Sequence, residues 1–499
     1  MQIGSLIRTT ARRHRERPAI TCDGRTVSFT EFDEATDRVG TALLADGFEP
    51  GDRVGVLLPN GIEGLVVYYA LAKAGLVRVP LNHRETPDEW AYKLTDSGCR
   101  GLVAGDELMA GTSLDAPDLA VVHGSEWLDR TCWSGPVGIC DVARDVEAPY
   151  RFGYTGGTTG RPKGAVLTMR SEHAELAHFL VDLLPDIGPD DVMLHAAPVI
   201  HASGAFFLPH FVRGAHNVIM TRFTPSAYLE ELQRTQATAT FLVPTMIAMT
   251  VDDPSAADLA VPALRRLCWG ASPIPPSVAE RAQQVFGRVL AQTYGQAEAP
   301  MAITLLKPDE HDRVGSAGRA YTLVDVRVVD GEDREVPVGE EGEVVTRGQH
   351  VMSRYWNRPE ATAETLRGGW LHTGDIGRMD DDGFLYLVDR RNDVIISGGS
   401  NVYPREVEDV LTGHPAVREA AVVGLPDERW GETVHAVVAL RPGVPAPSSE
   451  ELLAFAGERI AGYKRPRSLS FWEELPTSPA GKILRRSVRE AERAGLSRS

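Results

Sequence analysis

The sequence predicts an α/β fold: a large N-terminal domain of helix-covered β-sheets with a small β subdomain, then a small α+β C-terminal domain. Three observations support this prediction. Apolar strand-like runs alternate with helical stretches over most of the chain, short alternating strands follow from about Val324, and a mixed pattern fills the last hundred or so residues. The length of 499 residues exceeds what one hydrophobic core supports, so more than one domain is expected.

The first pattern begins with a strand-like run at 53–59 and a helical stretch at 64–74, and similar alternation returns at 192–197 and 240–244. This order is typical of parallel strands joined by helices, so the sheets should continue past residue 270.

Short alternating strands at 326–329 and 342–346, separated by turn-rich segments, predict the β subdomain at about 324–391. Further on, helices are expected at 404–411 and 449–460. A polar, charged run at 390–393 joins two apolar runs, which favours domains at 1–391 and 393–499.

Charge excludes some classes of partner. The chain has 52 basic and 69 acidic residues and a net charge of −17, a surface that repels nucleic acid and anionic lipid. Hydrophobic residues make up 43% of the chain without a long charge block, as in soluble globular proteins. An anionic ligand such as ATP therefore needs a local positive site made by backbone N–H groups, a few basic side chains and a metal ion.

Five cysteines without a C-x-x-C pair argue against a disulfide framework or zinc site, so a reduced cytoplasm is expected. The first residues have no apolar signal-like core and no stretch of 18 apolar residues occurs, which argues against secretion and a membrane span. An amphipathic helix packed on the body is predicted for the start of the chain.

The segment Tyr154-Thr-Gly-Gly-Thr-Thr-Gly-Arg-Pro-Lys-Gly164 is the most informative one. Its glycines let backbone N–H groups converge on a phosphate, its threonines add hydroxyl donors, and Lys163 adds a positive charge. The spacing matches neither G-x-x-x-x-G-K-[ST] nor G-x-G-x-x-G, and an ordinary flexible turn is the alternative. The candidate phosphate-binding residues besides Lys163 are Thr155, Gly156, Gly157, Thr158, Thr159 and Gly160.

This segment resembles the nucleotide loop of the adenylate-forming superfamily, in its branch of acyl-CoA synthetases and AMP-dependent ligases, and the resemblance extends over nearly the whole chain. It implies ATP, Mg²⁺ and, as a second substrate, coenzyme A. Family members typically have Ser where this chain has Gly156, so one hydroxyl toward the pyrophosphate is missing.

The resemblance places the segment with His201 in the acyl pocket, although a packed histidine without a ligand stays an open alternative. It implies that Tyr294 stacks on adenine and that Glu298 binds magnesium, the alternative being a solvated turn carboxylate. Most relatives carry Thr at Ala297. The segments that form the nucleotide and acyl sites would contribute Gly270, Ala271, Ser272, Gln292, Tyr294 and Gly295.

In Trp370-Leu-His-Thr-Gly-Asp375, the carboxylate after a tight turn is suited to accept both ribose hydroxyl hydrogens. The resemblance adds Arg390 as a second ribose contact and makes Asn392 the hinge of a mobile C-terminal domain, where relatives keep Asp or Lys.

Two C-terminal motifs complete the resemblance. Gly398 and Gly399 would admit a thin pantetheine chain beside the backbone, although a plain strand-to-helix turn is equally compatible. Lys482, in Pro476-Thr-Ser-Pro-Ala-Gly-Lys482, would contact the substrate carboxylate and the α-phosphate. Lys482, Glu298, His201 and Thr155 are the candidate catalytic residues.

The implied reaction is activation of a carboxylic acid to its acyl-AMP, followed by transfer to coenzyme A. Another acceptor (an amine or a carrier-protein thiol), nitrite activation for N–N bond formation, and a non-catalytic nucleotide-binding protein stay open. A medium-chain, branched or aromatic acid is the expected substrate. The oligomeric state is not determined by sequence patterns, and a homodimer is compatible with them.

Overall fold

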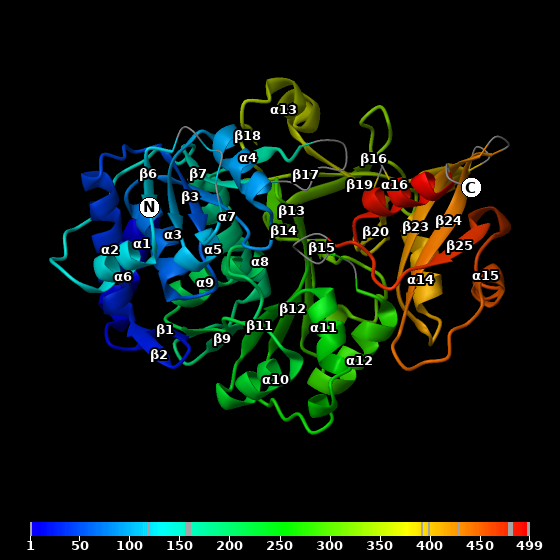
Figure 1. Cartoon of the computed structure of the whole chain (residues 1–499), viewed down its shortest axis with the longest axis horizontal. Coiled ribbons are helices and arrows are strands. Elements are labelled where there is room, and N and C mark those ends of the chain that lie inside the picture. Colours follow the sequence, from blue (N-terminus) through cyan, green and yellow to red (C-terminus); the bar gives the residue numbers. More distant parts are fainter. Residues whose placement is uncertain are drawn as a thin grey trace.

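The structure is a computed structural model and describes residues 2–112, 114, 116, 119–154, 161–272, 274–390, 393–397, 400–427, 430–477 and 483–496. Two large sheets and their helices make up the bulk of the molecule, a small antiparallel sheet lies beside them, and a fourth sheet with its helices forms the C-terminal end (Figure 1). The predicted α/β fold class is confirmed.

The largest sheet is parallel from β1 through β13, while β2, β14 and β15 run antiparallel to their neighbours. Strand β11 is buried along its whole length, as expected for a parallel strand covered on both faces. The spatial order is β15 (Arg319–Ala320), β14 (Ala299–Leu306), β13 (Leu290–Gln296), β12 (Arg266–Trp269), β11 (Ala239–Leu242), β9 (Val192–His195), β10 (His216–Ile219), β1 (Pro18–Cys22) and β2 (Arg25–Ser28).

The second large sheet is parallel in its centre, whereas β8 and β18 add antiparallel strands at one edge. Its order is β18 (Arg354–Tyr355), β8 (Gly164–Thr168), β7 (Pro149–Tyr154), β4 (Val77–Pro80), β3 (Arg53–Leu57), β5 (Cys99–Ala104) and β6 (Val121–His123). Because β18 comes from a distant part of the chain, this edge brings residues near 355 beside residues near 165.

Helices join and cover these strands, and α2 and α4 begin with capping boxes formed by Ser28 with Glu31 and by Thr86 with Glu89. They are α1 (Ile3–His14), α2 (Phe29–Ala45), α3 (Ile62–Lys73), α4 (Pro87–Ser97), α5 (Asp106–Met109), α6 (Ser125–Trp133), α7 (Met169–His178), α8 (Ala202–Ala205), α9 (Phe207–Val212), α10 (Pro225–Arg234), α11 (Pro244–Val251) and α12 (Pro276–Phe286).

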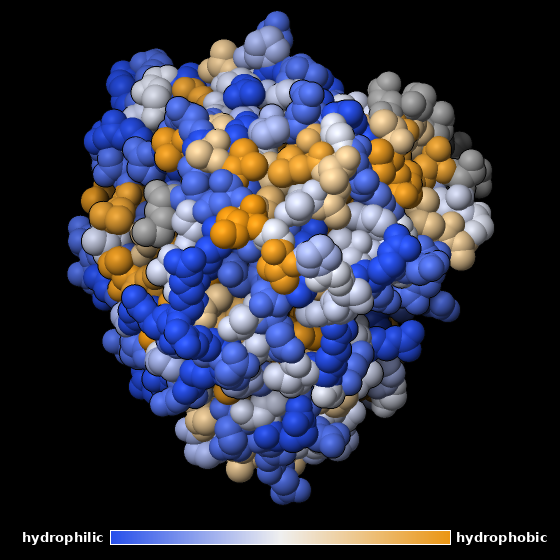
Figure 2. Space-filling view, turned by 90° about the vertical axis from the view of Figure 1, so that its left-hand side faces the viewer, coloured by the Kyte–Doolittle hydropathy of each residue, from blue (hydrophilic) through white to orange (hydrophobic). Residues whose placement is uncertain are grey.

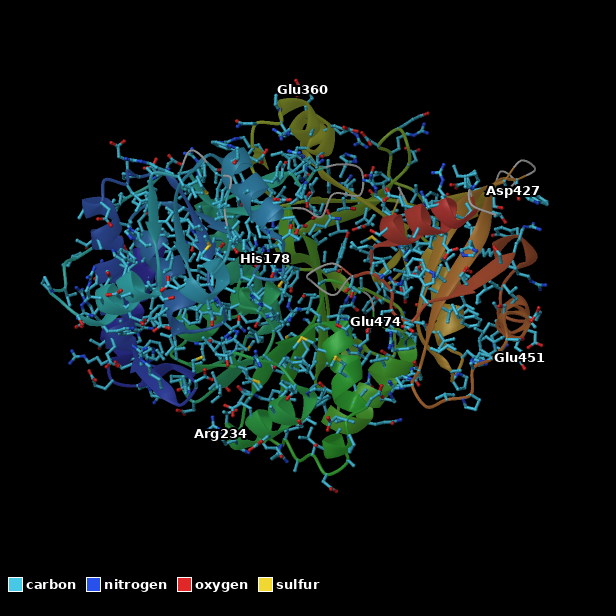
Figure 3. The ribbon with its side chains drawn as sticks, viewed as in Figure 1. His178, Arg234, Glu360, Asp427, Glu451 and Glu474 are labelled. Atoms are coloured by element: carbon cyan, nitrogen blue, oxygen red, sulfur yellow. The ribbon has the colours of Figure 1, made fainter. Side chains whose placement is uncertain are left out.

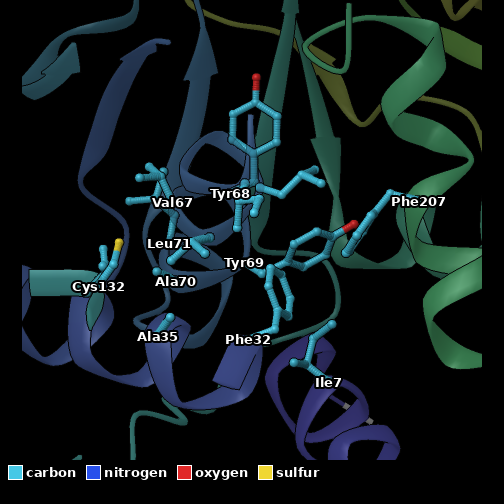
Figure 4. Close-up of a cluster of buried hydrophobic side chains, with 14 of the residues drawn as sticks. Ile7, Phe32, Ala35, Val67, Tyr68, Tyr69, Ala70, Leu71, Cys132 and Phe207 are labelled. Atoms are coloured by element: carbon cyan, nitrogen blue, oxygen red, sulfur yellow. The ribbon is translucent and has the colours of Figure 1, made fainter. Parts of the chain in front are cut away.

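The N-terminal helices pack through a buried aromatic cluster (Figure 4). The ring of Phe32 lies 6.1 Å from that of Tyr69 and 5.5 Å from that of Phe207, so α2, α3 and α9 meet at one point. Helix α1, with Ile7 fully buried, covers this cluster. The predicted first helix therefore packs on the body through its apolar face.

The small sheet is antiparallel, and its strands are β16 (Asp325–Val329), β17 (Gly342–Arg347), β19 (Leu371–Met379) and β20 (Leu385–Arg390), with α13 (Pro359–Thr365) inserted between β18 and β19. Where β17 meets β19 the pairing shifts register, and Gly374 takes a φ of +69° there. A glycine suits this conformation, which turns the following Asp375 toward the largest sheet.

The C-terminal sheet consists of β22 (Ser400–Val402), β21 (Ile395–Ser397), β24 (Gly431–Leu440), β23 (Val417–Asp427) and β25 (Ser468–Phe471). Its helices are α14 (Pro404–Thr412), α15 (Ser449–Gly457) and α16 (Arg485–Leu496). The helix expected at 449–460 ends three residues early, at Gly457, because glycine is a poor helix former.

Hydrophilic side chains cover most of the face formed by the N-terminal part, and apolar side chains gather there only in scattered groups (Figure 2). Within the described residues, every helix is too short or too polar to cross a bilayer.

A buried ionic cluster holds the first three helices together. The Nζ of Lys73, whose side chain is fully buried, lies 2.9 Å from Asp37 Oδ1 and also contacts the Asp33 carboxylate. Arg8 donates to the same Asp37 oxygen at 2.9 Å. Attraction between the opposite charges offsets the cost of removing them from water.

We predict that Lys73→Met destabilises the protein by about 3–5 kcal/mol, because it leaves the two carboxylates buried without their main counter-charge. Thermal unfolding followed by calorimetry measures the effect as a lower midpoint. Arg334→Ala is the matched control, because Arg334 pairs with Asp330 while its side chain is 68% exposed, and its effect should stay within about 0.5 kcal/mol. Equal midpoints for the two variants would contradict the prediction.

Candidate active site

A cavity of about 800 Å³ lies between the largest sheet and the C-terminal part. Trp269, Tyr294 and Asp375 line it on one side, and Arg405 and Arg485 line it on the other. Glu474, another lining residue, lies between α11 and the C-terminal sheet (Figure 3). The carboxyl ends of parallel strands β12 and β13 open into this cavity, which is the usual position of a ligand site in an open α/β sheet.

Asp375 is the best-defined polar group of the cavity. Tyr294 Oη donates to Asp375 Oδ2 at 2.6 Å, and Gln296 Nε2 donates to the same oxygen at 2.7 Å and to the Thr373 carbonyl at 2.8 Å. Asp375 is only 8% exposed. Two donors from β13 therefore hold one carboxylate oxygen of β19 and fix the orientation of the carboxylate.

Two glycines let neighbouring strands of this wall pack closely, Gly270 against β13 and Gly295 against β14. A Cβ on Gly270 would lie 2.7 Å from the Thr293 carbonyl oxygen, and a Cβ on Gly295 would lie 2.2 Å from the Met301 nitrogen. Ala271 adopts a φ of +70°, which is unusual for a residue with a side chain. Gln292 and Ser272 line the same cavity. The nucleotide-site residues predicted in these two segments therefore come together.

Trp269 completes this wall, and its ring is almost completely buried at 1% exposure. Its Nε1 lies buried without a hydrogen-bond acceptor among the described residues. A buried N–H without an acceptor is costly, so a bound group or water at this position would stabilise it.

Glu298 lies in the turn between β13 and β14, and Lys163 directly precedes β8. Tyr355 touches both: its hydroxyl donates to Glu298 Oε1, and the Lys163 Nζ lies 4.4 Å from the centre of its ring. The structure thus brings the predicted metal ligand and the predicted phosphate-binding lysine to one tyrosine.

His201 begins the α8 segment, and its Nε2 lies 2.7 Å from the Nδ2 of Asn82. Although His201 is partly exposed to solvent, desolvation by the surrounding protein, together with Lys93 and His83, lowers its pKa. The ring is therefore neutral near pH 7, and its Nε2 accepts the hydrogen bond from the Asn82 amide.

Several predicted residues lie outside the described part of the chain: Thr155, Gly156, Gly157, Thr158, Thr159, Gly160, Asn392, Gly398, Gly399 and Lys482. Their roles stay predictions. Arg390 is described through its backbone, which pairs with Asp375 across β19 and β20. The segment that contains Lys482 is flanked by Thr477 and Ile483, which form a β-bridge and line the cavity.

Comparison with known proteins identifies the family. Residues 7–356 match the AMP-binding enzyme family, and residues 406–482 match the AMP-binding enzyme C-terminal domain. The chain belongs to the AMP-binding enzyme family. The resemblance to adenylate-forming enzymes that the motifs indicated is thereby confirmed.

Similar curated members of the family are acid ligases. A feruloyl-CoA synthase of Amycolatopsis sp is 39% identical over 94% of this chain and 95% of its own. A fatty acid–[acyl-carrier-protein] ligase of Streptomyces coeruleorubidus is 36% identical over 98% of this chain and 96% of its own. The prediction of an AMP-forming acid–thiol ligase agrees with these matches.

Solved family structures share the whole fold. The o-succinylbenzoate CoA synthetase of Bacillus subtilis, in complex with its acyl-adenylate intermediate, has a TM-score of 0.87 and 30% identity and covers 97% of each chain. The amide bond synthetase of Marinactinospora thermotolerans also has a TM-score of 0.87 and 30% identity, over 98% of this chain and 100% of its own.

Gln296, Tyr355 and Asn82 were not predicted from the sequence. Gln296 could have been found, because Tyr294 and Gln296 are two residues apart on one strand and so share a face. Tyr355 and Asn82 meet their partners only through tertiary contacts, so no local pattern marks them.

His195 supports the His201 segment and makes the fold sensitive to pH. It is fully buried, with its Nδ1 3.0 Å from Ser203 Oγ and its Nε2 3.1 Å from Asn217 Oδ1. Burial lowers its pKa from 6.5 to about 4. Because the unfolded chain binds this proton more tightly, stability present above pH 6.5 is lost as the pH falls toward 4.

We predict that the titration of His195 alone lowers the free energy of unfolding by about 2 kcal/mol when the pH falls from 7.5 to 5. The unfolding midpoint, measured across this range, should therefore fall less steeply for His195→Asn, which cannot take up the proton. Variants with identical slopes would show that His195 does not titrate in this way. His414→Asn serves as the control, because His414 lies in the C-terminal part, away from this segment.

Proposed function

We propose that the protein joins a carboxylic acid to coenzyme A at the expense of ATP, through an acyl-AMP intermediate. The observation that carries this proposal is Asp375, held by Tyr294 and Gln296 at the wall of a cavity large enough for a nucleotide. Full-length similarity to a feruloyl-CoA synthase supports the thiol as acceptor.

Adenosine binding follows from the cavity wall. Asp375 would accept hydrogen bonds from the ribose hydroxyls, because its orientation is already fixed by two donors. Tyr294 offers a ring for stacking, and Gly270 and Gly295 line the same cavity. These residues fit a nucleotide, and we assign them to ATP.

The phosphates would be held by Lys163 and by the predicted loop residues Thr155, Gly156, Gly157, Thr158, Thr159 and Gly160. Glu298 offers a hard carboxylate oxygen of the kind that magnesium prefers, and its position near Lys163 fits a metal–triphosphate site. Magnesium, when bound, would screen the phosphate charges.

In the first half-reaction a carboxylate oxygen attacks the α-phosphorus, and the bond to pyrophosphate breaks. Lys482 would stabilise the charge on the transferring oxygens. In the second, a thiol sulfur attacks the acyl carbonyl carbon, AMP leaves and the thiol proton is released. We propose that the C-terminal domain turns about Asn392 between the two steps and brings Gly398 and Gly399 toward the acyl-AMP.

An aromatic or other apolar acid is the proposed substrate. The residues that follow His201 pack into a buried apolar cluster with Phe206 and Phe241, beside Val243 and Met301. A cluster of this kind suits an apolar acyl group. The feruloyl-CoA synthase similarity makes hydroxycinnamic acids the first to test. Five buried, free cysteines are compatible with the expected cytoplasmic location.

We predict that the protein catalyses ATP–pyrophosphate exchange with at least one acid from a panel of aryl, fatty and amino acids. The exchange should require the acid. Lys482→Ala should reduce the exchange by at least about a hundredfold, because it removes charge stabilisation of the transition state. Arg486→Ala is the control, since Arg486 is 58% exposed and pairs with Glu490 on its own helix.

Release of AMP, measured with and without coenzyme A, then identifies the acceptor. Acceleration by coenzyme A supports the ligase. Exchange without acceleration would redirect the search to an amine or a carrier-protein thiol, and the absence of exchange with every acid, or exchange that survives Lys482→Ala, would overturn the proposal.

The proposed contact between Asp375 and the ribose is tested by measuring how an Asp375 variant binds ATP and 2′-deoxy-ATP. Asp375→Asn should weaken ATP binding about 10- to 100-fold in calorimetry, because hydrogen bonds to a charged group are lost. It should weaken 2′-deoxy-ATP binding less, since that nucleotide already lacks one hydroxyl. Asp333→Asn, at an exposed ion pair with Arg367, is the control. Equal losses for both nucleotides would argue against a ribose contact.

A further inference from the structure

Two charged groups of the proposed site come from different sheets. Glu298 lies in a turn of the largest sheet, and Lys163 leads into β8 of the second large sheet. Both groups must keep a constant separation if they bind one metal–nucleotide complex, because small misplacements of positioned groups are costly in catalysis.

Tyr355 joins the two groups. Its hydroxyl donates to Glu298 Oε1, and its ring centre lies 4.4 Å from the Nζ of Lys163. The first contact is a hydrogen bond to a carboxylate, and the second is a cation–π contact at close range. One side chain therefore contacts both charged groups: its hydroxyl contacts Glu298, and its ring contacts Lys163.

The backbone around Tyr355 is anchored to the same two neighbours. In β18, Tyr355 pairs with Ala165 of β8, and the Trp356 N–H donates to the Gly164 carbonyl at 2.8 Å. On the other side, the Met352 N–H donates to the Glu298 carbonyl at 2.7 Å. The backbone of residues 352–356 alone therefore links the start of β8 to the turn that contains Glu298.

Tyr355 is also fixed by packing. Its side chain is 4% exposed and packs in the cluster that contains Ala165 and Tyr294. Close packing of this kind limits the rotation of the ring and keeps the hydroxyl at its partner.

We propose that Tyr355 is a positioning residue that sets the Glu298 carboxylate and the Lys163 ammonium relative to each other for the metal–nucleotide complex. This inference rests on the proposed function, in which Glu298 binds magnesium and Lys163 binds phosphate. It assigns the hydroxyl to the metal ligand and the ring to the phosphate-binding lysine, so the two effects can be separated by substitution.

Tyr355→Phe keeps the ring and the packing and removes only the donor to Glu298. Tyr355→Leu removes both contacts. Tyr386→Phe is the matched control, because the Tyr386 hydroxyl, on β20 of the small sheet, also donates to a carboxylate, that of Asp380, at 3.2 Å. All three are compared with the wild type.

The main measurement is the binding of Mn²⁺ in the presence of α,β-methylene-ATP, followed by the electron paramagnetic resonance of free Mn²⁺. The bridging methylene blocks adenylation, so turnover does not contribute. Tyr355→Phe should weaken Mn²⁺ binding about three- to tenfold, the value of one hydrogen bond, while Tyr386→Phe leaves it unchanged. Calorimetry with the same nucleotide in EDTA should show wild-type affinity for Tyr355→Phe and a loss for Tyr355→Leu.

In pyrophosphate exchange, Tyr355→Phe should need about three- to tenfold more Mg²⁺ for half-activation and regain most of its rate at saturating Mg²⁺. Unchanged Mn²⁺ affinity in Tyr355→Phe, or a loss equal to that of Tyr386→Phe, would overturn the inference. The Phe variant decides the question alone if the Leu variant fails to fold. Wild-type protein without any exchange would refute the proposed function instead, and the Mn²⁺ comparison would still test Tyr355.

Discussion

The pair of hydrogen bonds that Tyr294 and Gln296 donate to Asp375 is the interaction around which the site is organised. It joins β13 of the largest sheet to β19 of the small sheet. A carboxylate that is 8% exposed needs such donors, because desolvation of an unpaired charge would cost several kcal/mol. The position of the small sheet against the large body is therefore coupled to the chemistry of the cavity.

The groups proposed to bind the phosphates of ATP and magnesium are likewise held by contacts between separate elements. Glu298, Lys163 and Tyr355 belong to three segments, and short backbone hydrogen bonds from the 352–356 segment hold the other two. Asp375, Glu298 and Lys163 are thus each supported by an element other than their own. Rigid support of this kind lets an enzyme bind a charged transition state without reorganising itself.

The overall charge of −17 makes this local organisation necessary. A strongly acidic protein repels a triphosphate at a distance, so binding depends on a few precisely placed donors and cations. Arg405 and Arg485 on the C-terminal side of the cavity add positive charge, and Arg485 is paired with Glu408 and Asp393. Pairing keeps these side chains oriented without creating a broad basic surface.

Part of the site was predictable because its signals are local. A Gly/Thr-rich loop with a lysine, a Thr-Gly turn before Asp375 and alternating apolar runs depend on neighbouring residues, and they indicated the fold class and the family. Helix ends were less accurate, as at Gly457, because the last turn depends on packing as well as propensity.

The sequence by itself determined the α/β class, the family and the residue types that meet a nucleotide, since backbone freedom and donor chemistry are properties of short segments. Only the tertiary structure decided how these groups are held. Gln296 meets Asp375, Tyr355 meets Glu298 and Asn82 meets His201 across separations of 79, 57 and 119 residues. Contacts between such distant residues follow from how sheets and helices pack, and no periodicity along the chain encodes them.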